Sequence, residues 1–314
     1  MNSGQAVHDI LRRHHIELTL LDLGASASSY PPFRPATPSS FLIEVDPDTR
    51  DFGERNSNPE TMVVNRAITD SDSVDSVNLY LTRSPYCSST LKPDFRRLRN
   101  FPYDDLFEVV GTSTVPATSL NRLSAELNRP FDWIKLDTQG TEFRILRSMK
   151  ENLLASLLCC DVEISLYAHY ETADTFSQFH DFMIAKGFVI SDILTVQERA
   201  RIRRNDAMEL AVRGVPQNLM KRWPTSPELR YIRAVNHDEP INALDRVLRI
   251  WAIAYFTGNY PYCYFLATRL SETAGHAELG QQLQSISVRQ LRRSRTRLVG
   301  TRILSRIQKW WESR

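Results

Sequence analysis

Short apolar runs alternate with amphipathic stretches through the first two thirds of the chain. Apolar residues recur at helical spacing over Thr141–Leu154 and Ala173–Lys186. Between such stretches the chain carries short apolar or alternating runs, and we expect strands over His15–Leu23, Phe41–Val45, Thr61–Ile68, Val77–Thr82, Asp132–Asp137, Cys160–Leu166 and Phe188–Leu194. Strands that alternate with helices predict an α/β fold with a largely parallel central sheet.

The pattern changes after Arg213. Four prolines punctuate a polar stretch there, at positions 216, 224, 227 and 240, and no strand-like alternation follows them. Asn242–Leu270 is rich in apolar residues at helical spacing, and Leu279–Arg314 is a basic, mostly helical pattern. We therefore expect two domains, residues 1–214 with the α/β fold and residues 215–314 as a helical, basic C-terminal appendage.

Charge is unevenly distributed along the chain. The net charge is only +2, but residues 289–314 carry nine Lys or Arg and one acid, 9 − 1 = +8, which leaves 2 − 8 = −6 for the rest. Val299, Ile303, Ile307 and Trp310 lie near one helical face of this tail. That pattern is compatible with peripheral contact to an anionic membrane, or with packing of the same face on the protein body. No specific nucleic-acid module is recognisable.

The remaining composition favours a cytoplasmic protein. The four cysteines, Cys87, Cys159, Cys160 and Cys263, have no zinc-type spacing and form no evident disulfide framework. Met1–Leu11 lacks a basic flank followed by an apolar region, so we expect no secretory signal, and no apolar run is long enough to span a membrane. We expect no metal site.

The first candidate motif follows the first apolar run. Asp22-Leu23-Gly24-Ala25-Ser26 has a glycine at the strand exit, where a ligand can approach the backbone closely. Asp46 lies 22 residues after Gly24, at the end of the next strand, and an acid there suits ribose hydroxyls. Because no Walker lysine and no further glycine of a dinucleotide fingerprint is present, the pattern indicates a nucleoside without phosphates, such as S-adenosylmethionine.

The second candidate motif is the strand exit around Asp137. Asp137 ends the run DWIKLD, and open α/β sheets bind ligands where their strands end. Gln139 and Glu142 follow on the turn and the early helix. An acid in a first helical turn also stabilises the helix dipole, so Glu142 has a structural interpretation as well as a chemical one.

These residues carry a resemblance to a known family. IKLDTQGTEFRIL resembles the hallmark of FkbM-type methyltransferases. LDLGAS, IEVDPD, LYLTRSPYCSSTLKPD and VEISLYAHYETADTFSQFHDFMIAKGF resemble further family segments, in the same order along the chain. The resemblance covers about residues 16–212 and implies a class I methyltransferase-like, Rossmann-like fold that binds S-adenosyl-L-methionine.

The resemblance also implies roles for residues. Asp22, Gly24, Ala25 and Ser26 would flank the methionine part of the cofactor, Asp46 would hold the ribose, and the segment from Ala67 to Asp70 would border the adenine. Asp137 would lie between cofactor and acceptor. The chain departs from the family at residues 27–29, Ala-Ser-Ser, where a second glycine is usual.

The resulting hypothesis is O-methylation of a sugar or small-molecule hydroxyl. Such a reaction needs alignment of the acceptor and a base for its proton. Asp137 and Glu163 are the candidate catalytic residues, and the loop with Tyr86, Ser88 and Ser89 is a candidate cover for the acceptor. The alternative is a catalytically impaired, methyltransferase-like binding module that acts through the basic C-terminal helix.

Overall fold

The chain forms two compact units in the computed structural model, which describes residues 3–25, 29–48, 50, 57, 60–215, 222–236 and 243–312. The sheet unit comprises Leu18–Ala234. The helical unit is discontinuous, because it combines Met1–Glu17 with Val235–Arg314.

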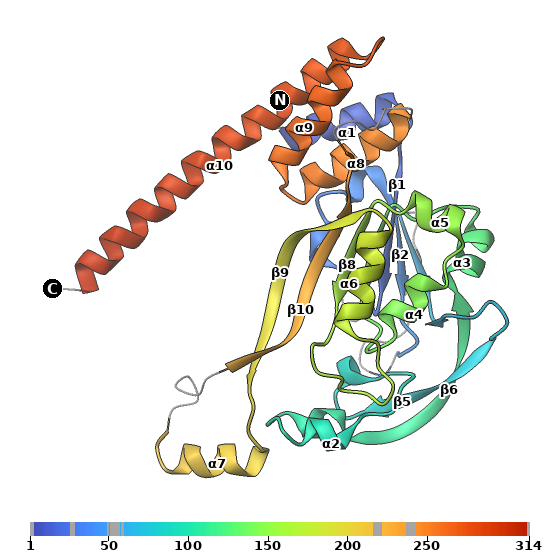
Figure 1. Cartoon of the computed structure of the whole chain (residues 1–314), viewed down its shortest axis with the longest axis vertical. Coiled ribbons are helices and arrows are strands. Elements are labelled where there is room, and N and C mark those ends of the chain that lie inside the picture. Colours follow the sequence, from blue (N-terminus) through green and yellow to red (C-terminus); the bar gives the residue numbers. More distant parts are fainter. Residues whose placement is uncertain are drawn as a thin grey trace. The chain divides into compact units, whose positions relative to one another are not determined.

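A seven-stranded mixed sheet forms the centre of the sheet unit (Figure 1). Its strands are β1 (Leu18–Leu23), β2 (Ser40–Val45), β3 (Thr61–Val64), β7 (Trp133–Leu136), β8 (Cys159–Glu163), β9 (Phe188–Ala200) and β10 (Arg222–Arg233). The order is β3-β2-β1-β7-β8-β10-β9. The pairs among the first five are parallel, and β10 is antiparallel to both of its neighbours.

The strand order reverses beside β1. The chain runs outward from β1 to β2 and β3, then returns to add β7 and β8 on the other side of β1. Open α/β sheets bind their ligands at such a switch point, beyond the carboxyl ends of the strands. The fold is thus the α/β, class I methyltransferase-like (Rossmann-like) architecture with a mostly parallel sheet, as the sequence predicts.

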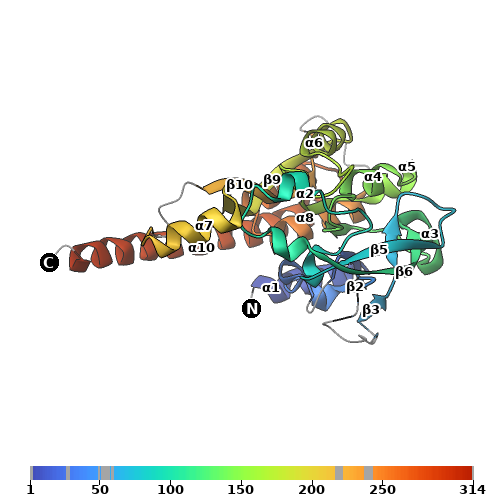
Figure 2. The same cartoon turned by 90° about the horizontal axis from the view of Figure 1, so that it is seen from below.

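One face of the sheet holds the main apolar core. Leu21, Leu23, Ile134 and Leu136 alternate along β1 and β7 and are fully buried on this face. The covering helices are α3 (Leu120–Leu127), α4 (Glu142–Arg147), α5 (Glu151–Ser156) and α6 (Phe176–Ala185). The last three lie together on one side of the sheet (Figure 2).

The opposite face of the same strands is unusually polar. Asp22, Lys135 and Asp161 take the intervening positions of β1, β7 and β8. The Arg230 guanidinium of β10 pairs with the fully buried Asp161 carboxylate, with nitrogen–oxygen distances of 2.7 and 2.6 Å. Phe33 of η1 (Pro31–Phe33) packs edge-on against the Trp133 ring beside this pair. η2 (Thr37–Ser39) leads from there into β2.

A second, three-stranded sheet borders the carboxyl ends of the large one. It consists of β4 (Ala67–Thr69), β6 (Val109–Ser119) and β5 (Ser76–Thr82), in that order. The connection from β5 to β6 contains η3 (Pro85–Cys87), α2 (Phe95–Leu98) and η4 (Asp104–Phe107). Bridges from Ser89 to Tyr80 and from Pro93 to Tyr170 hold this connection in place.

Two predicted elements are each divided in the structure. The expected strand Thr61–Ile68 is β3 and β4, which pair in different sheets because the chain turns at Asn65 and Arg66. The expected helix Thr141–Leu154 is α4 and α5, because Lys150 has an extended backbone, with ψ of 145°. The N–H of Lys150 donates to the Asn121 side chain instead of continuing a helix.

The expectation of no strand after Arg213 was wrong. β9 continues to Ala200, α7 (Arg204–Val212) follows, and β10 returns between β8 and β9. β10 contains Pro224 and Pro227, which argue against a central strand. Its pairing with β8 starts only at Glu228, however, and on that side Pro227 contributes only its carbonyl, which accepts from the Ile164 N–H at 3.2 Å. The sheet unit consequently extends past the predicted boundary at residue 214, to Ala234.

Helices from both ends of the chain build the helical unit. It contains α1 (Ser3–Arg13), α8 (Leu244–Phe256), α9 (Tyr260–Ser271) and α10 (Ala277–Glu312). His8 of α1 stacks on Phe256 of α8, with ring centroids 5.2 Å apart. Gly280 allows α10 to approach α9, since a Cβ there would lie 2.3 Å from the Ser271 nitrogen.

The predictions for the basic tail stay untested. Side chains from residue 295 onward lie outside the described residues, so the predicted membrane or packing face at Val299 to Trp310 stays a prediction. Among the helices that the structure describes, none combines the length and apolar character required to cross a membrane.

Candidate functional site

A cavity of about 480 Å³ lies at the switch point of the large sheet. Its floor is made by the residues that follow β1, β2, β7 and β8, and its other walls come from the small sheet, the β5–β6 connection and β9. The volume falls in the range of about 300–1,000 Å³ that is typical of small-molecule sites.

The turn after β1 depends on Gly24. Its φ is +76°, and a Cβ at this position would lie 2.1 Å from the Asp137 carbonyl oxygen. The N–H of Gly24 donates to the Val45 carbonyl at 2.9 Å, and the N–H of Asp137 donates to the Leu23 carbonyl at 3.2 Å. Glycine therefore lets the ends of β1, β2 and β7 meet at the cavity floor.

Lys135 lies between two carboxylates on the polar face. Its ammonium is 3.2 Å from Asp137 Oδ2 and 3.6 Å from Asp22 Oδ1, and it also donates to the Leu23 and Gly24 carbonyls. Burial alone would lower the pKa of Lys135, but Asp137 and Asp22 outweigh that effect and raise it. Lys135 lines the cavity as a permanent cation, and the sequence interpretation did not assign it a role.

Gln139 orients Asp137 from the following turn. Its Nε2 donates to Asp137 Oδ1 at 2.6 Å, and its Oε1 accepts from the Tyr170 hydroxyl at 2.8 Å. Ser89 donates to the Gln139 carbonyl at 2.8 Å. Gln139 has φ of 59° and Gly140 has φ of 108°, so the turn uses left-handed backbone twice in succession. The Asp137 carboxylate is thus held on both oxygens, by Gln139 and by Lys135.

Glu142 stabilises the turn at residues 138–140 through hydrogen bonds to its backbone. It is buried in the first turn of α4 and accepts from the N–H groups of Thr138 and Gly140, at 2.9 and 3.0 Å. Burial raises its pKa to about 7, although these hydrogen bonds favour the ionised form. The structural interpretation of Glu142 therefore accounts for its contacts within the turn.

Asp46 faces the cavity from the end of β2. One oxygen, Oδ1, accepts from the Asp48 N–H at 2.8 Å, whereas Oδ2 has no hydrogen-bond partner among the residues that the structure describes. Burial raises the pKa of Asp46 to about 6, with the nearby Asp48 charge acting in the same direction. Asp46 is therefore predominantly ionised at pH 7 and can accept hydrogen bonds from hydroxyl groups.

Ala67 lines the cavity beside Asp46, together with its neighbours Arg66 and Ile68. Asp70 is exposed and does not line it. β4 ends at Thr69, and the chain then bends away from the cavity toward α3.

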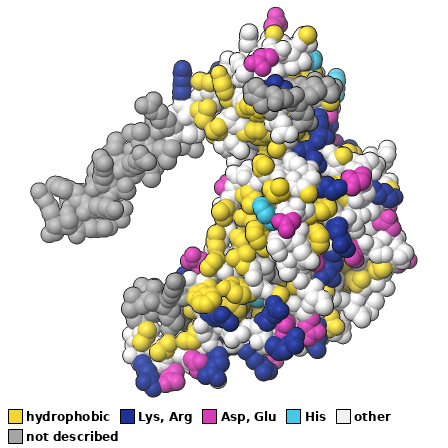
Figure 3. Space-filling view, in the orientation of Figure 1, with side chains coloured by type: hydrophobic (Ala, Val, Ile, Leu, Met, Phe, Trp, Pro, Cys, Tyr) yellow, Lys and Arg dark blue, Asp and Glu magenta, His cyan; other side chains and the backbone are white. Residues whose placement is uncertain are grey.

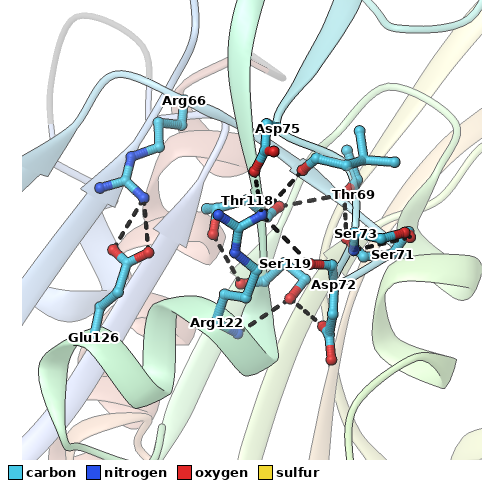
Figure 4. A network of polar contacts seen from close by, with 11 residues as sticks. Arg66, Thr69, Ser71, Asp72, Ser73, Asp75, Thr118, Ser119, Arg122 and Glu126 are labelled. Carbon is cyan, nitrogen blue, oxygen red and sulfur yellow. Dashed lines mark hydrogen bonds and ion pairs between the residues drawn. The ribbon is translucent and has the colours of Figure 1, made fainter.

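A polar network holds that bend (Figure 4). The Asp72 carboxylate accepts from Ser119 and Asn121, and the Arg122 guanidinium donates to Asp75 at 2.8 Å. Arg66 forms an ion pair with Glu126 of α3, at 2.9 Å. The acids of this loop thus serve to attach β4 to α3, which keeps the apolar Ala67 and Ile68 at the cavity wall.

Glu163 lies beside Asp137 on the floor of the cavity. The pairing of Leu136 with Val162 puts Asp137 and Glu163 at neighbouring positions of adjacent strands, on the same face. Glu163 Oε1 accepts from Gln197 Nε2 at 3.0 Å. Burial and then the Asp137 charge raise the pKa of Glu163 to about 8. The sheet thus brings the two predicted catalytic carboxyl groups together.

The cover of the cavity contains the predicted loop residues and a buried histidine. Tyr86, Ser88 and Ser89 line it as part of the β5–β6 connection. His169 lies within 3.1 Å of the Tyr103 hydroxyl and 3.3 Å of Ser165 Oγ. Burial lowers the pKa of His169 to about 4, so it is neutral at physiological pH. His169 therefore serves as a neutral hydrogen-bond partner of Tyr103 and Ser165.

The remaining residues of the first motif lie behind the cavity or outside the description. Asp22 and Ala25 are buried and do not line the cavity, and Asp22 Oδ2 accepts from the Tyr30 N–H at 3.0 Å. Burial raises the pKa of Asp22 against the opposing charge of Lys135. Ser26, Ala27 and Ser28 lie outside the described residues. Within the described ranges, no three His, Cys, Asp or Glu side chains are grouped to hold a metal ion.

Comparison with solved structures finds a distant likeness. The chain is similar to 1,6-didemethyltoxoflavin-N1-methyltransferase from Burkholderia thailandensis, solved with 1,6-didemethyltoxoflavin and S-adenosylhomocysteine bound. The two are 12% identical, the match covers 74% of this chain and 79% of that one, and the TM-score is 0.27. No curated protein matches the chain.

The decisive comparison is with protein families. The model of the methyltransferase FkbM domain matches residues 32–190, which is 159 of the 314 residues and therefore more than half of the chain. The match runs from residue 32, before β2, to the first residues of β9, and it includes the Asp137 turn and Glu163. The family resemblance of the strand-exit motif is confirmed, and the chain belongs to the FkbM family of S-adenosyl-L-methionine-dependent methyltransferases.

Proposed function

We propose that the protein transfers a methyl group to a hydroxyl of a sugar or another small molecule. The observation that carries this proposal is the pair of carboxyl groups, Asp137 and Glu163, at adjacent strand ends in the cavity that Asp46 also lines. A hydroxyl acceptor must lose a proton, and a neighbouring carboxylate is a suitable base.

The cavity has the groups that S-adenosyl-L-methionine requires. Asp46 would accept hydrogen bonds from the ribose hydroxyls through its unpartnered oxygen, and Ala67 with Ile68 offers an apolar wall for the adenine. Asp137, fixed by Lys135 and Gln139, would face the junction of cofactor and acceptor. When bound, the cofactor supplies the methyl group on a sulfonium centre.

Glu163 is the proposed base. Because its pKa is about 8, only a minority of the carboxyl is ionised at pH 7, and the ionised fraction grows as the pH rises. An acid with a raised pKa holds a proton more strongly, so the Glu163 carboxylate is a better proton acceptor than an ordinary glutamate. The partnered Asp137 would orient the acceptor hydroxyl toward it.

The test is the pH dependence of S-adenosylhomocysteine release with a panel of polyhydroxylated acceptors. We expect kcat/KM for the acceptor to rise between pH 6 and 9 with an inflection near the Glu163 pKa of about 8, since the base must be ionised. Glu163→Gln should lower kcat by about 10²–10⁴-fold and remove the inflection. Glu198→Gln, an exposed acid of β9, is the matched control and should leave the profile unchanged. An unchanged profile in Glu163→Gln would reject the assignment.

Calorimetric titration with S-adenosylmethionine tests the cofactor arm separately. Asp46→Ala should weaken binding about tenfold or more through loss of the ribose contacts. If the wild-type protein binds neither S-adenosylmethionine nor S-adenosylhomocysteine, the alternative of a binding module that acts through the basic C-terminal helix becomes the leading hypothesis.

A further inference from the structure

Among the described residues, three cationic side chains line the cavity, and two of them form ion pairs. Arg66 pairs with Glu126 at 2.9 Å, and Lys135 pairs with Asp137 at 3.2 Å. The third, Arg199 of β9, is exposed and forms no ion pair with any carboxylate in the described part of the chain. Its Nη1 donates to the Glu198 carbonyl at 3.0 Å, which leaves the other donors of the guanidinium available.

Arg199 lies on the same face of β9 as Gln197, whose amide contacts Glu163. Successive residues on one face of a strand are two positions apart, or about 7 Å. The backbone positions of Arg199 and Gln197 are therefore about 7 Å apart along β9, and Gln197 contacts the proposed base, Glu163.

Tyr103 provides an aromatic surface next to Arg199. The guanidinium carbon lies 5.8 Å from the centroid of the Tyr103 ring, and the Tyr103 hydroxyl is held by His169 at 3.1 Å. His169 is neutral at physiological pH, because burial lowers its pKa to about 4. Glu163 is mostly protonated there for the reason given above. Within the described ranges, this side of the cavity therefore presents one guanidinium, that of Arg199, without a carboxylate partner.

Arg199 differs from the exposed arginines near it because its side chain lines the cavity. Arg203 pairs with Asp206 at 2.7 Å and Arg204 pairs with Asp105 at 2.6 Å, whereas the Arg201 guanidinium lies over the Trp223 ring, 5.1 Å from its centroid. Cations and carboxylates are accordingly interleaved over the end of the sheet unit near α2 and α7 (Figure 3). A mixed surface of this kind does not suit a polyanion, whereas one available guanidinium inside a cavity suits a small ligand with one anionic group.

We propose that Arg199 binds an anionic substituent of the acceptor, a carboxylate or a phosphate, while the acceptor's hydroxyl lies at Glu163. The inference rests on the proposed function, since it names the acceptor class of the same site. A guanidinium binds either anion through two parallel hydrogen bonds, and Tyr103 covers one face of the ring that joins the anion to the hydroxyl.

The experiment compares matched acceptors that differ in one anionic group. The pairs are D-glucuronate and D-glucose, glucose 6-phosphate and D-glucose, and 3-hydroxybenzoate and 3-hydroxybenzyl alcohol. The Kd of each compound is measured by NMR titration of the full chain loaded with S-adenosylhomocysteine, so that the readout does not depend on turnover. We expect the charged member to bind at least about tenfold more tightly in one or more pairs.

Substitutions at Arg199 identify the source of this preference. Arg199→Ala should abolish it, and Arg199→Lys should retain part of the preference for phosphate but less of that for carboxylate, because two-point binding is lost. Arg203→Ala removes the same charge from an exposed site outside the cavity and should leave every Kd unchanged. The carboxylate and phosphate pairs show which anion the site prefers.

The result that would overturn the inference is the absence of a charge preference in all pairs, including a complete lack of binding by the charged members. A preference that survives in Arg199→Ala would overturn it as well. Failure of the proposed function would give a different result. Charge-selective binding through Arg199 without methyl transfer to any hydroxyl would support the anionic subsite and reject hydroxyl methylation.

Discussion

The contact between Gly24 and Asp137 shows how one residue determines the shape of the cavity floor. Two separate constraints act at Gly24, a left-handed backbone and the close Asp137 carbonyl oxygen. The first disfavours any side chain, and the second excludes even a methyl group unless one strand end moves.

We expect Gly24→Ala to lower the free energy of unfolding by roughly 3–5 kcal/mol, because strain at positive φ adds to a steric clash. Urea titration followed by tryptophan fluorescence measures the change. Any folded fraction should also bind S-adenosylhomocysteine more weakly, because the turn lies at the cavity.

Gly214→Ala is the control for the backbone contribution. Gly214 has φ of +77°, almost the same as Gly24, but a Cβ there would meet no atom within 4 Å. It should therefore cost only about 1 kcal/mol. Equal costs at the two positions would contradict the clash with Asp137.

Single residues also show what the sequence reveals about the site. Asp46, Asp137 and Glu163 could be found because each lies at or near the end of an apolar strand, and parallel strands end at one edge. Lys135 stands out in the sequence as a cation inside the apolar run WIKL. Its partner Asp22 could not be identified from the sequence, because the two residues are 113 positions apart. The sequence did not indicate a role for Arg199, because only the structure shows that its side chain lines the cavity and which nearby arginines form ion pairs.

Among the elements, β10 joins the family-matched region to the rest of the sheet unit. It lies outside residues 32–190 and pairs with β8, the strand that ends in Glu163. Its Arg230 supplies the counter-charge for Asp161, whose carboxylate is fully buried. Burial raises the pKa of Asp161, and Arg230 opposes that effect.

Arg230→Leu should destabilise the sheet unit by about 3–5 kcal/mol, since it leaves the Asp161 charge buried without a partner. The loss is measured by urea unfolding at pH 7. The double variant Arg230→Leu, Asp161→Leu should recover most of it, because no lone charge remains. A double variant as unstable as the single one would show that Arg230 acts through packing on Trp133 rather than through charge.

Elements differed in how well the sequence predicted them. β1, β2, β7 and β8 are short apolar runs with clear ends, and all four were expected close to their observed bounds. β10 was not expected, because two prolines obscured a strand whose partners are distant in sequence. The division of Thr61–Ile68 between two sheets was also not predictable, since local pattern does not specify which strand each half will pair with.

At the scale of the molecule, the binding site and the helical unit are built from different parts of the chain. Every residue that lines the cavity belongs to the sheet unit. The helical unit has a core of its own, in which Ile10 of α1 and Leu248 and Trp251 of α8 are fully buried.

Ile10→Asp should therefore lower the stability of the helical unit without changing the affinity for S-adenosylhomocysteine. A buried, unpaired carboxylate costs several kcal/mol, which hydrogen exchange of α8 and α9 will detect as lost protection. Gln5→Ala, on the exposed side of α1, should leave exchange unchanged. Loss of ligand affinity in Ile10→Asp would show that the two units are energetically coupled.

The discontinuity of the helical unit has a consequence for synthesis on the ribosome. α1 ends at Arg13, but α8, which it contacts, begins only at Leu244. At roughly 5–20 residues per second, translation of the 230 intervening residues, 244 − 13 − 1, takes on the order of 10–50 seconds. Throughout that interval α1 lacks its partners α8 and α10, while the sheet unit, which ends at Ala234, is being synthesised. The nascent chain therefore carries an amphipathic helix, α1, that is available to chaperones until α8 is synthesised.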